Sequence, residues 1–158
     1  MTTLHDLIIV IHILSATLLF GTGLGTAFQM WMTHRSGDVR PIAEVSRNVV
    51  RADFFFTLPA VIVQPATGLA LIRIDGYSLW EPWLVAAYVL YVLVGACWLP
   101  VVWIQLEARN LAAQAAAAGT ALPPRYFRLM RWWFWFGWPA FSAVLGIFWL
   151  MVNKPALW

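Results

Sequence analysis

Four long apolar stretches constrain the fold of this chain more than any other feature. They lie at about 7–32, 54–74, 83–106 and 131–152, with ends uncertain by roughly two to four residues. Each is close to or longer than the roughly 20 residues that a helix needs to cross a bilayer. Hydrophobic residues make up 62% of the chain and charged residues 11%, against about 25% charged in a soluble domain. The composition therefore predicts an integral membrane protein.

The four stretches and their connections occupy the whole length of 158 residues. This predicts one transmembrane domain, 1–158, with no separate soluble part. The predicted fold class is all-α, a polytopic membrane four-helix bundle, and the lipid bilayer is its first partner. The net charge of +3 does not indicate a nucleic-acid partner, because the arginines lie in the connections between spans, where membrane topology explains them.

Basic residues gather in two of the three connections. The first holds Arg35, Arg40, Arg47 and Arg51, and the third holds Arg109, Arg125, Arg128 and Arg131. The opposite side has only Arg73 and Lys154. Short loops rich in arginine stay in the cytoplasm. The sequence thus predicts both basic connections in the cytoplasm and both termini outside, which in a bacterial cytoplasmic (inner) membrane is the periplasmic side.

The basic connections are themselves predicted to be helical. Apolar residues recur at helical spacing within 33–53, which predicts an amphipathic helix at the membrane surface leading into the second span. The third span is expected to continue through an alanine-rich segment to Gly119. Pro123 and Pro124 then predict a stiff break before the fourth span.

His12 is the most informative single residue, because it lies inside the first apolar stretch. An ionisable group at membrane depth usually faces the bundle interior and often marks a functional site. Neutral imidazole is a good ligand for haem iron or copper. Two interpretations stay open: a metal or cofactor ligand, or a hydrogen bond from the ring to a neighbouring helix.

Other candidates surround His12 in the predicted bundle. Antiparallel packing brings Gln64 and Thr67 of the second span to its depth, where this segment supplies either a hydrogen bond to the ring or a distal ligand. Arg73, near the outer end of the second span, suits a carboxylate such as a haem propionate, or pairs with Asp75 or Asp6. Tyr91 of the third span reaches a similar depth and either hydrogen-bonds to a ligand or fills space near the interface.

Gly21 and Gly25 form a small-xxx-small pair in the first span. Such a pair allows two helices to approach closely, within the chain or between copies in a homo-oligomer. The same lack of side chains leaves room for a flat cofactor. At the inner end, Asp53 is expected to pair with Arg51, or with Gln29 or Gln105 of adjacent spans.

A copper-handling site is the alternative metal prediction. Its candidate ligands are His5, His12, Met30, Met32 and His34, whose thioether and imidazole groups suit copper(I). They are spread over both ends of the first span. The motifs of zinc proteases, of covalent haem attachment and of phosphate-binding loops are absent from the sequence.

Several segments together resemble a bacterial family of predicted integral membrane proteins of unknown function. They are His12-Ile13-Leu14-Ser15, Leu19-Phe20-Gly21-Thr22-Gly23, Asp53, Phe56-Thr57-Leu58-Pro59-Ala60, Gln64-Pro65-Ala66-Thr67-Gly68, Trp98-Leu99-Pro100 and Trp149-Leu150-Met151-Val152-Asn153-Lys154-Pro155. That family is distantly similar to the copper-resistance protein D group and to the oxygen-independent protoporphyrinogen oxidase of the HemJ type. In the latter, a histidine of the first span and a lysine of the second are associated with haem b.

The resemblance implies that His12 binds haem b. The lysine has no counterpart, because Lys154 lies in the C-terminal tail, so the oxidation of protoporphyrinogen is not carried over with it. The leading hypothesis is a haem b protein with a redox or electron-transfer role, acting on a membrane-soluble partner such as a quinone or porphyrin. The alternatives are copper handling and a non-catalytic membrane scaffold subunit.

Overall fold

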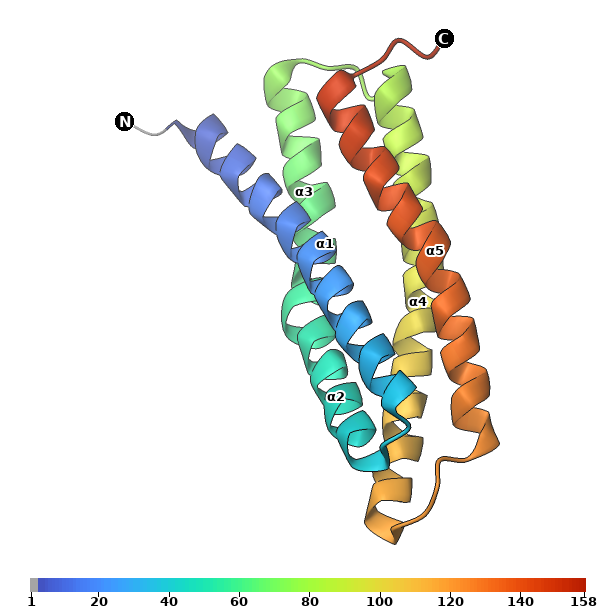
Figure 1. Cartoon of the computed structure of the whole chain (residues 1–158). Helices are drawn as coiled ribbons and strands as arrows, with labels where there is room; N and C mark the ends of the chain where they lie inside the picture. Colours follow the sequence, from blue (N-terminus) through green and yellow to red (C-terminus); the bar gives the residue numbers. More distant parts are fainter. Residues whose placement is uncertain (1–2) are drawn as a thin grey trace.

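The computed structural model describes residues 3–158 and contains helices but no strand within that range (Figure 1). The elements are α1 (Leu4–Ser36), α2 (Val39–Ala52), the π-helical turn η1 (Asp53–Thr57), α3 (Leu58–Asp75), α4 (Pro82–Ala118) and α5 (Pro124–Asn153). The helices form four columns long and apolar enough to cross a membrane, which confirms the all-α four-helix membrane bundle. Residues 1 and 2 of the predicted domain lie outside the described residues.

Local chemistry accounts for where the helices begin and end. Thr3 and Asp6 form a reciprocal capping box at the start of α1. Gly37, Gly76 and Gly119 each follow a helix in the left-handed conformation, which glycine adopts without steric cost. The predicted extension of the third span to Gly119 is therefore confirmed, as is the break that precedes α5.

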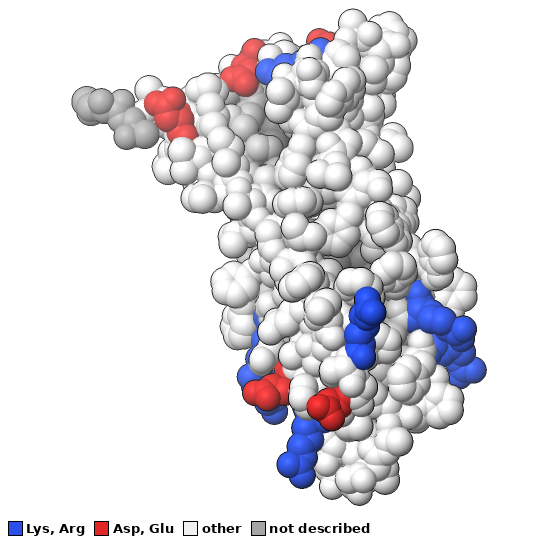
Figure 2. Space-filling view, in the orientation of Figure 1, with Lys and Arg blue, Asp and Glu red and all other residues white. Residues whose placement is uncertain are grey.

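The two ends of the bundle differ in charge. The chain termini lie at the same end (Figure 1), which we call the terminal end. Most of the Lys and Arg side chains visible in Figure 2 lie toward the opposite end, which we call the basic end, and the surface between carries no charged group in that view. A broad uncharged belt is what a helical protein presents to lipid hydrocarbon.

The segment predicted to be an amphipathic surface helix is helical, but the prediction that it lies along the membrane surface is wrong. α2 continues through η1 into α3 as one column, Val39–Asp75, and stands beside α4 (Figure 1). Its apolar stripe, with Ile42 and Val49 almost fully buried, packs on protein rather than on lipid. The physical reason is the extension of α4 beyond the third span, which offers an apolar partner surface close by.

The main core lies toward the basic end. It joins α1, α2, α4 and α5 through buried residues that include Met30, Ile104, Ala108, Ala112 and Tyr126. Toward the terminal end, α1 diverges from α4 and α5 and stays beside α3 (Figure 1). The half of α1 nearer the terminal end is therefore held mainly by α3, which is the arrangement that surrounds His12.

We predict that Ala112→Leu will destabilise the protein by about 1–3 kcal/mol, because Ala112 is fully buried and an inserted side chain overpacks a tight helix contact. Thermal unfolding of the purified protein in detergent measures the effect. Ala113→Leu is the matched control, since Ala113 is exposed and surface changes stay within about 0.5 kcal/mol. Equal destabilisation by both variants would contradict the close packing at Ala112.

Candidate functional site

His12 lies on the face of α1 that packs against α3, where hydrogen bonds engage both of its ring nitrogens. Its Nδ1 is 2.8 Å from the Thr67 hydroxyl, and its Nε2 is 3.1 Å from the Gln64 amide nitrogen. The Gln64 carbonyl oxygen in turn accepts a bond from the Ser15 hydroxyl. The structure thus confirms the predicted hydrogen bonding of Gln64 and Thr67 to His12.

The direction of these bonds assigns the tautomer of His12. The Thr67 hydroxyl donates to the Val63 carbonyl at 2.8 Å, so its oxygen is left to accept from His12, and Nδ1 carries the ring proton. The Gln64 amide nitrogen is a donor, so Nε2 accepts and carries no proton. We infer from this pattern that His12 carries its ring proton on Nδ1 and a lone pair on Nε2.

Gly68 makes room for the ring. A Cβ placed on Gly68 would come within 3.3 Å of His12 Cε1, closer than most side chains pack. The absence of a side chain at this position lets α1 and α3 approach at the depth of His12. The Gln64-Pro65-Ala66-Thr67-Gly68 segment therefore forms a fitted surface for one imidazole.

The other predicted site residues on α1 and α3 are not brought to His12. Gly21 and Gly25 are exposed, with open space above them. At about 100° per residue, Gly21 lies on the side of α1 roughly opposite His12. The same spacing places Arg73 roughly opposite Gln64 on α3, and Arg73 is exposed. The expected pairing of Asp75 with Arg73 is absent, because Asp75 contacts His5 at 2.8 Å.

Tyr91 has a structural partner in the α3 backbone. Its hydroxyl donates to the Val61 carbonyl at 2.7 Å. In a regular helix that carbonyl accepts from the residue four positions later, which here is Pro65 and has no N–H. Tyr91 thus supplies the hydrogen bond that Pro65 cannot, as an unpaired carbonyl in lipid requires.

The candidate copper ligands do not converge. Residues 3–158 contain no cluster of three or more histidine, cysteine, aspartate or glutamate side chains that could hold a metal. His5 is engaged with Asp75 at the terminal end, whereas Met30 is buried in the core near the basic end. Met32 is exposed, and His34 packs near Tyr126 and Phe127.

A second buried polar group lies in η1, at the position where the sequence predicted that Asp53 pairs with Arg51, or with Gln29 or Gln105. Asp53 is 8% exposed and accepts from the Thr57 hydroxyl at 2.8 Å. Its other oxygen has no hydrogen-bond partner within residues 3–158, so the expected pairing with Arg51 is not made. The buried side chain of Gln105 approaches the carboxylate from α4.

The signal for η1 in the sequence is Pro59. Its ring would clash with the carbonyl four residues earlier, that of Phe55, in a regular α-helix. The wider turn, closed by a bond from the Leu58 N–H to the Asp53 carbonyl, relieves that clash. Such π-turns recur at functional sites.

We predict that Tyr91→Phe will destabilise the protein by about 1 kcal/mol, because it leaves the Val61 carbonyl without its donor inside the membrane. Tyr88→Phe is the control, since Tyr88 is exposed and its hydroxyl forms no hydrogen bond with any of residues 3–158. Chemical or thermal unfolding in detergent compares the two variants. A loss of stability in Tyr88→Phe as large as that in Tyr91→Phe would contradict this role.

The tautomer of His12 is directly measurable. Nitrogen-15 NMR of the labelled ring is expected to show a protonated Nδ1 and an unprotonated Nε2. Thr67→Val removes the acceptor of the Nδ1 proton, so it is expected to shift the tautomer balance, whereas Thr17→Val, on the exposed side of α1, leaves the spectrum unchanged. A protonated Nε2 in the unmodified protein would contradict the assignment.

The chain was compared with known proteins through its sequence and its structure. The family described as predicted integral membrane protein (DUF2269) matches residues 6–155, which includes every helix that carries the His12 cluster. No curated protein and no solved structure matches the chain. The match covers nearly the whole chain, and this protein therefore belongs to the DUF2269 family of predicted integral membrane proteins, whose function is unknown.

Proposed function

We propose that the protein binds haem b in the membrane, with His12 Nε2 as an axial ligand, and has a redox or electron-transfer role. One observation carries the proposal. The Thr67 hydroxyl oxygen accepts a hydrogen bond from His12 Nδ1, so Nε2 carries the lone pair, to which the Gln64 amide donates in this structure. Histidines that bind metals donate their other ring N–H to a neighbouring acceptor in this way, and that bond fixes both tautomer and ring orientation.

The residues around His12 fit this role with one local change. The Gln64 amide now donates to Nε2 and would have to turn away from it, as a rotation of its flexible side chain allows. The outer half of α1 diverges from α4 and α5 (Figure 1), and its apolar residues Val10, Ile13 and Leu14 are 50–57% exposed. An apolar macrocycle finds hydrocarbon-like surroundings at this depth.

Each residue of the cluster has a definite task in the proposal. His12 binds the iron, Thr67 holds the proton on Nδ1, and Gly68 leaves the space that the ring needs. His5, engaged with Asp75, is not a second axial ligand, because both histidines leave the same helix. Haem b would supply one-electron chemistry, and the membrane location suits a quinone or porphyrin as its partner.

The resemblance to the copper-resistance protein D and HemJ-type groups supports the same assignment, since it maps their first-span histidine onto His12. It is an argument by analogy and carries no residue beyond that histidine. Gly21 and Gly25 take no part in this haem site. Their exposed, open face instead suits close packing by a second copy of the chain, as the predicted homo-oligomer requires.

An absorption spectrum of protein purified from haem-replete cells tests the proposal. We expect a Soret band that is lost in His12→Ala and retained in His34→Ala, which removes the imidazole at the other end of α1. Thr67→Val should keep the band but weaken haem affinity by about 10–100-fold, the usual effect of losing such a supporting bond.

Three other outcomes would contradict the haem proposal. A colourless protein whose His12→Gln variant is stable and functional in cells would assign the cluster to helix packing and favour the scaffold alternative. A Soret band unchanged in His12→Ala would place the ligand elsewhere. Stoichiometric copper in colourless protein purified anaerobically with copper(I) would favour the copper alternative instead.

A further inference from the structure

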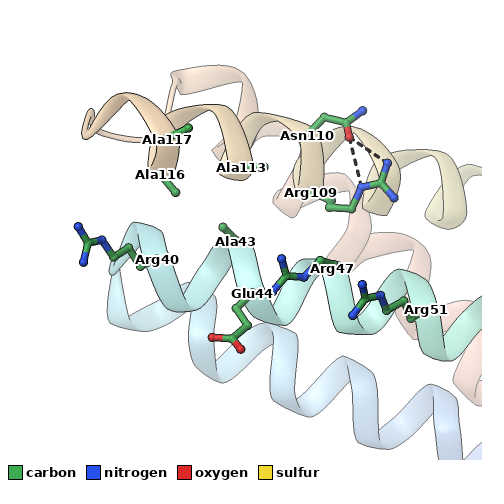
Figure 3. A pocket seen from close by; sticks show the side chains of 10 residues that line it. All are labelled: Arg40, Ala43, Glu44, Arg47, Arg51, Arg109, Asn110, Ala113, Ala116 and Ala117. Carbon is green, nitrogen blue, oxygen red and sulfur yellow. Dashed lines mark hydrogen bonds between the residues drawn. The ribbon is translucent and has the colours of Figure 1, made fainter.

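A groove of about 770 Å³ lies between α2 and α4 at the basic end. Figure 3 shows its walls, with arginines from α2 on one side and Arg109 and Asn110 from α4 on the other. The lining residues are Arg40, Ala43, Glu44, Arg47, Arg51, Arg109, Asn110, Ala113, Ala116 and Ala117. The groove is far from the His12 cluster and plays no part in the proposed function.

The groove is hollow because α4 presents alanines to it. Ala108 and Ala112 are fully buried against the neighbouring helices, and they bring α2 and α4 close together. Ala113, Ala116 and Ala117, on the adjoining stripe, line the groove. Because these methyl groups are short, they leave an open floor between the arginine side chains.

Positive charge borders this floor without being neutralised by an ion pair within residues 3–158. Four arginines line the groove against one carboxylate, that of Glu44, which Figure 3 draws on the side of α2 away from α4. Within residues 3–158 none of these five side chains forms an ion pair, and Glu107, the nearest carboxylate on α4, is held by Arg125 at 2.9 Å. The Arg109 guanidinium donates two hydrogen bonds to the side-chain oxygen Oδ1 of Asn110, of 3.2 and 2.9 Å, which orient it.

The depth of these arginines matches a layer of lipid headgroups. The second predicted span begins at Phe54, and the third ends at Leu106. At 1.5 Å per residue, Arg51 and Arg109 therefore each lie about 4.5 Å beyond the hydrocarbon. Arg47 lies about 10 Å beyond it by the same measure. The headgroup layer extends roughly 5–8 Å on each side of the core, so Arg51 and Arg109 lie within it, and Arg47 lies just beyond it, where its long side chain can reach back into the layer.

An apolar surface adjoins the arginines on the membrane side. Phe54, Phe55 and Phe56 follow Arg51 in the chain and are 64%, 67% and 50% exposed. A phosphate bound by guanidinium groups next to such a surface is one that carries acyl chains, since the exposed rings have lipid as their natural partner. A free phosphate ion would make no use of them.

We propose that this groove binds the phosphate of an anionic phospholipid headgroup. Arg47, Arg51 and Arg109 contact the phosphate oxygens, to which the planar guanidinium offers paired donors. The acyl chains extend along Phe54–Phe56. Basic pockets between helices at a membrane surface are the kind of site that anionic lipids occupy.

Native mass spectrometry of the full chain in uncharged detergent, titrated with phosphatidylglycerol, tests the proposal. The variant Arg47→Gln/Arg51→Gln/Arg109→Gln is expected to bind about 100-fold more weakly, or roughly fivefold for each arginine removed. The control Arg35→Gln/Arg128→Gln/Arg131→Gln removes the same charge at the same end outside the groove, and it should change binding less than about threefold. Phosphatidylcholine should bind the unmodified chain at least tenfold more weakly.

A variant that keeps every charge makes the test independent of any effect of the triple substitution on folding. Ala113→Leu fills the floor of the groove and should weaken phosphatidylglycerol binding at unchanged thermal stability. Equal weakening in the two triple variants, or full binding by Ala113→Leu, would overturn the proposal in favour of diffuse attraction between the basic end and anionic lipid. Displacement of the lipid by equimolar inorganic phosphate would also overturn it and assign the groove to a soluble phosphate.

Discussion

The close packing of α2 against the alanine face of α4 is the contact on which the rest of this structure depends. Ala108 and Ala112 are fully buried in it, and small side chains let two helices approach closely. The contact turns α2 upright, so that it forms one column with α3. That column then carries Gln64 and Thr67 to the level of His12, and the same contact leaves the arginine groove beside it.

Backbone hydrogen bonding in lipid explains the two irregular places in that column. Pro59 and Pro65 each interrupt the backbone hydrogen bonding of the helix, and inside a membrane no water replaces the missing hydrogen bond. At Pro59 the chain widens into η1, and the buried Asp53 begins this turn. At Pro65 a side chain from another helix, Tyr91, supplies the missing donor. One proline is accommodated locally and the other by tertiary structure, which gives Tyr91 a structural task.

The candidate site was predictable in depth but not in direction around the helix. Counting residues from the end of each span correctly placed Gln64 and Thr67 opposite His12, because the rise per residue is constant. Gly21, Gly25 and Arg73 were grouped with them because of their residue types: two glycines that leave room for a flat cofactor and an arginine that suits a propionate. The structure gives those residues open or exposed positions, and helical spacing places them on the far faces of their helices. The rotation of a helix depends on which face its neighbours bury, which hydropathy alone does not reveal in an apolar span.

The amino-acid sequence by itself determined the membrane class, the four spans, the glycine and proline positions that end the helices, and the depth that His12 shares with Gln64 and Thr67. These follow from local properties: hydropathy, length and backbone conformational preference. Only the tertiary structure decided that α2 stands on α4 instead of lying on the membrane, that Asp53 is buried in a π-turn, and that arginines distant in sequence border one groove. Each of these depends on contacts between residues far apart in the chain, because apolar helix faces are alike until they pack against one another.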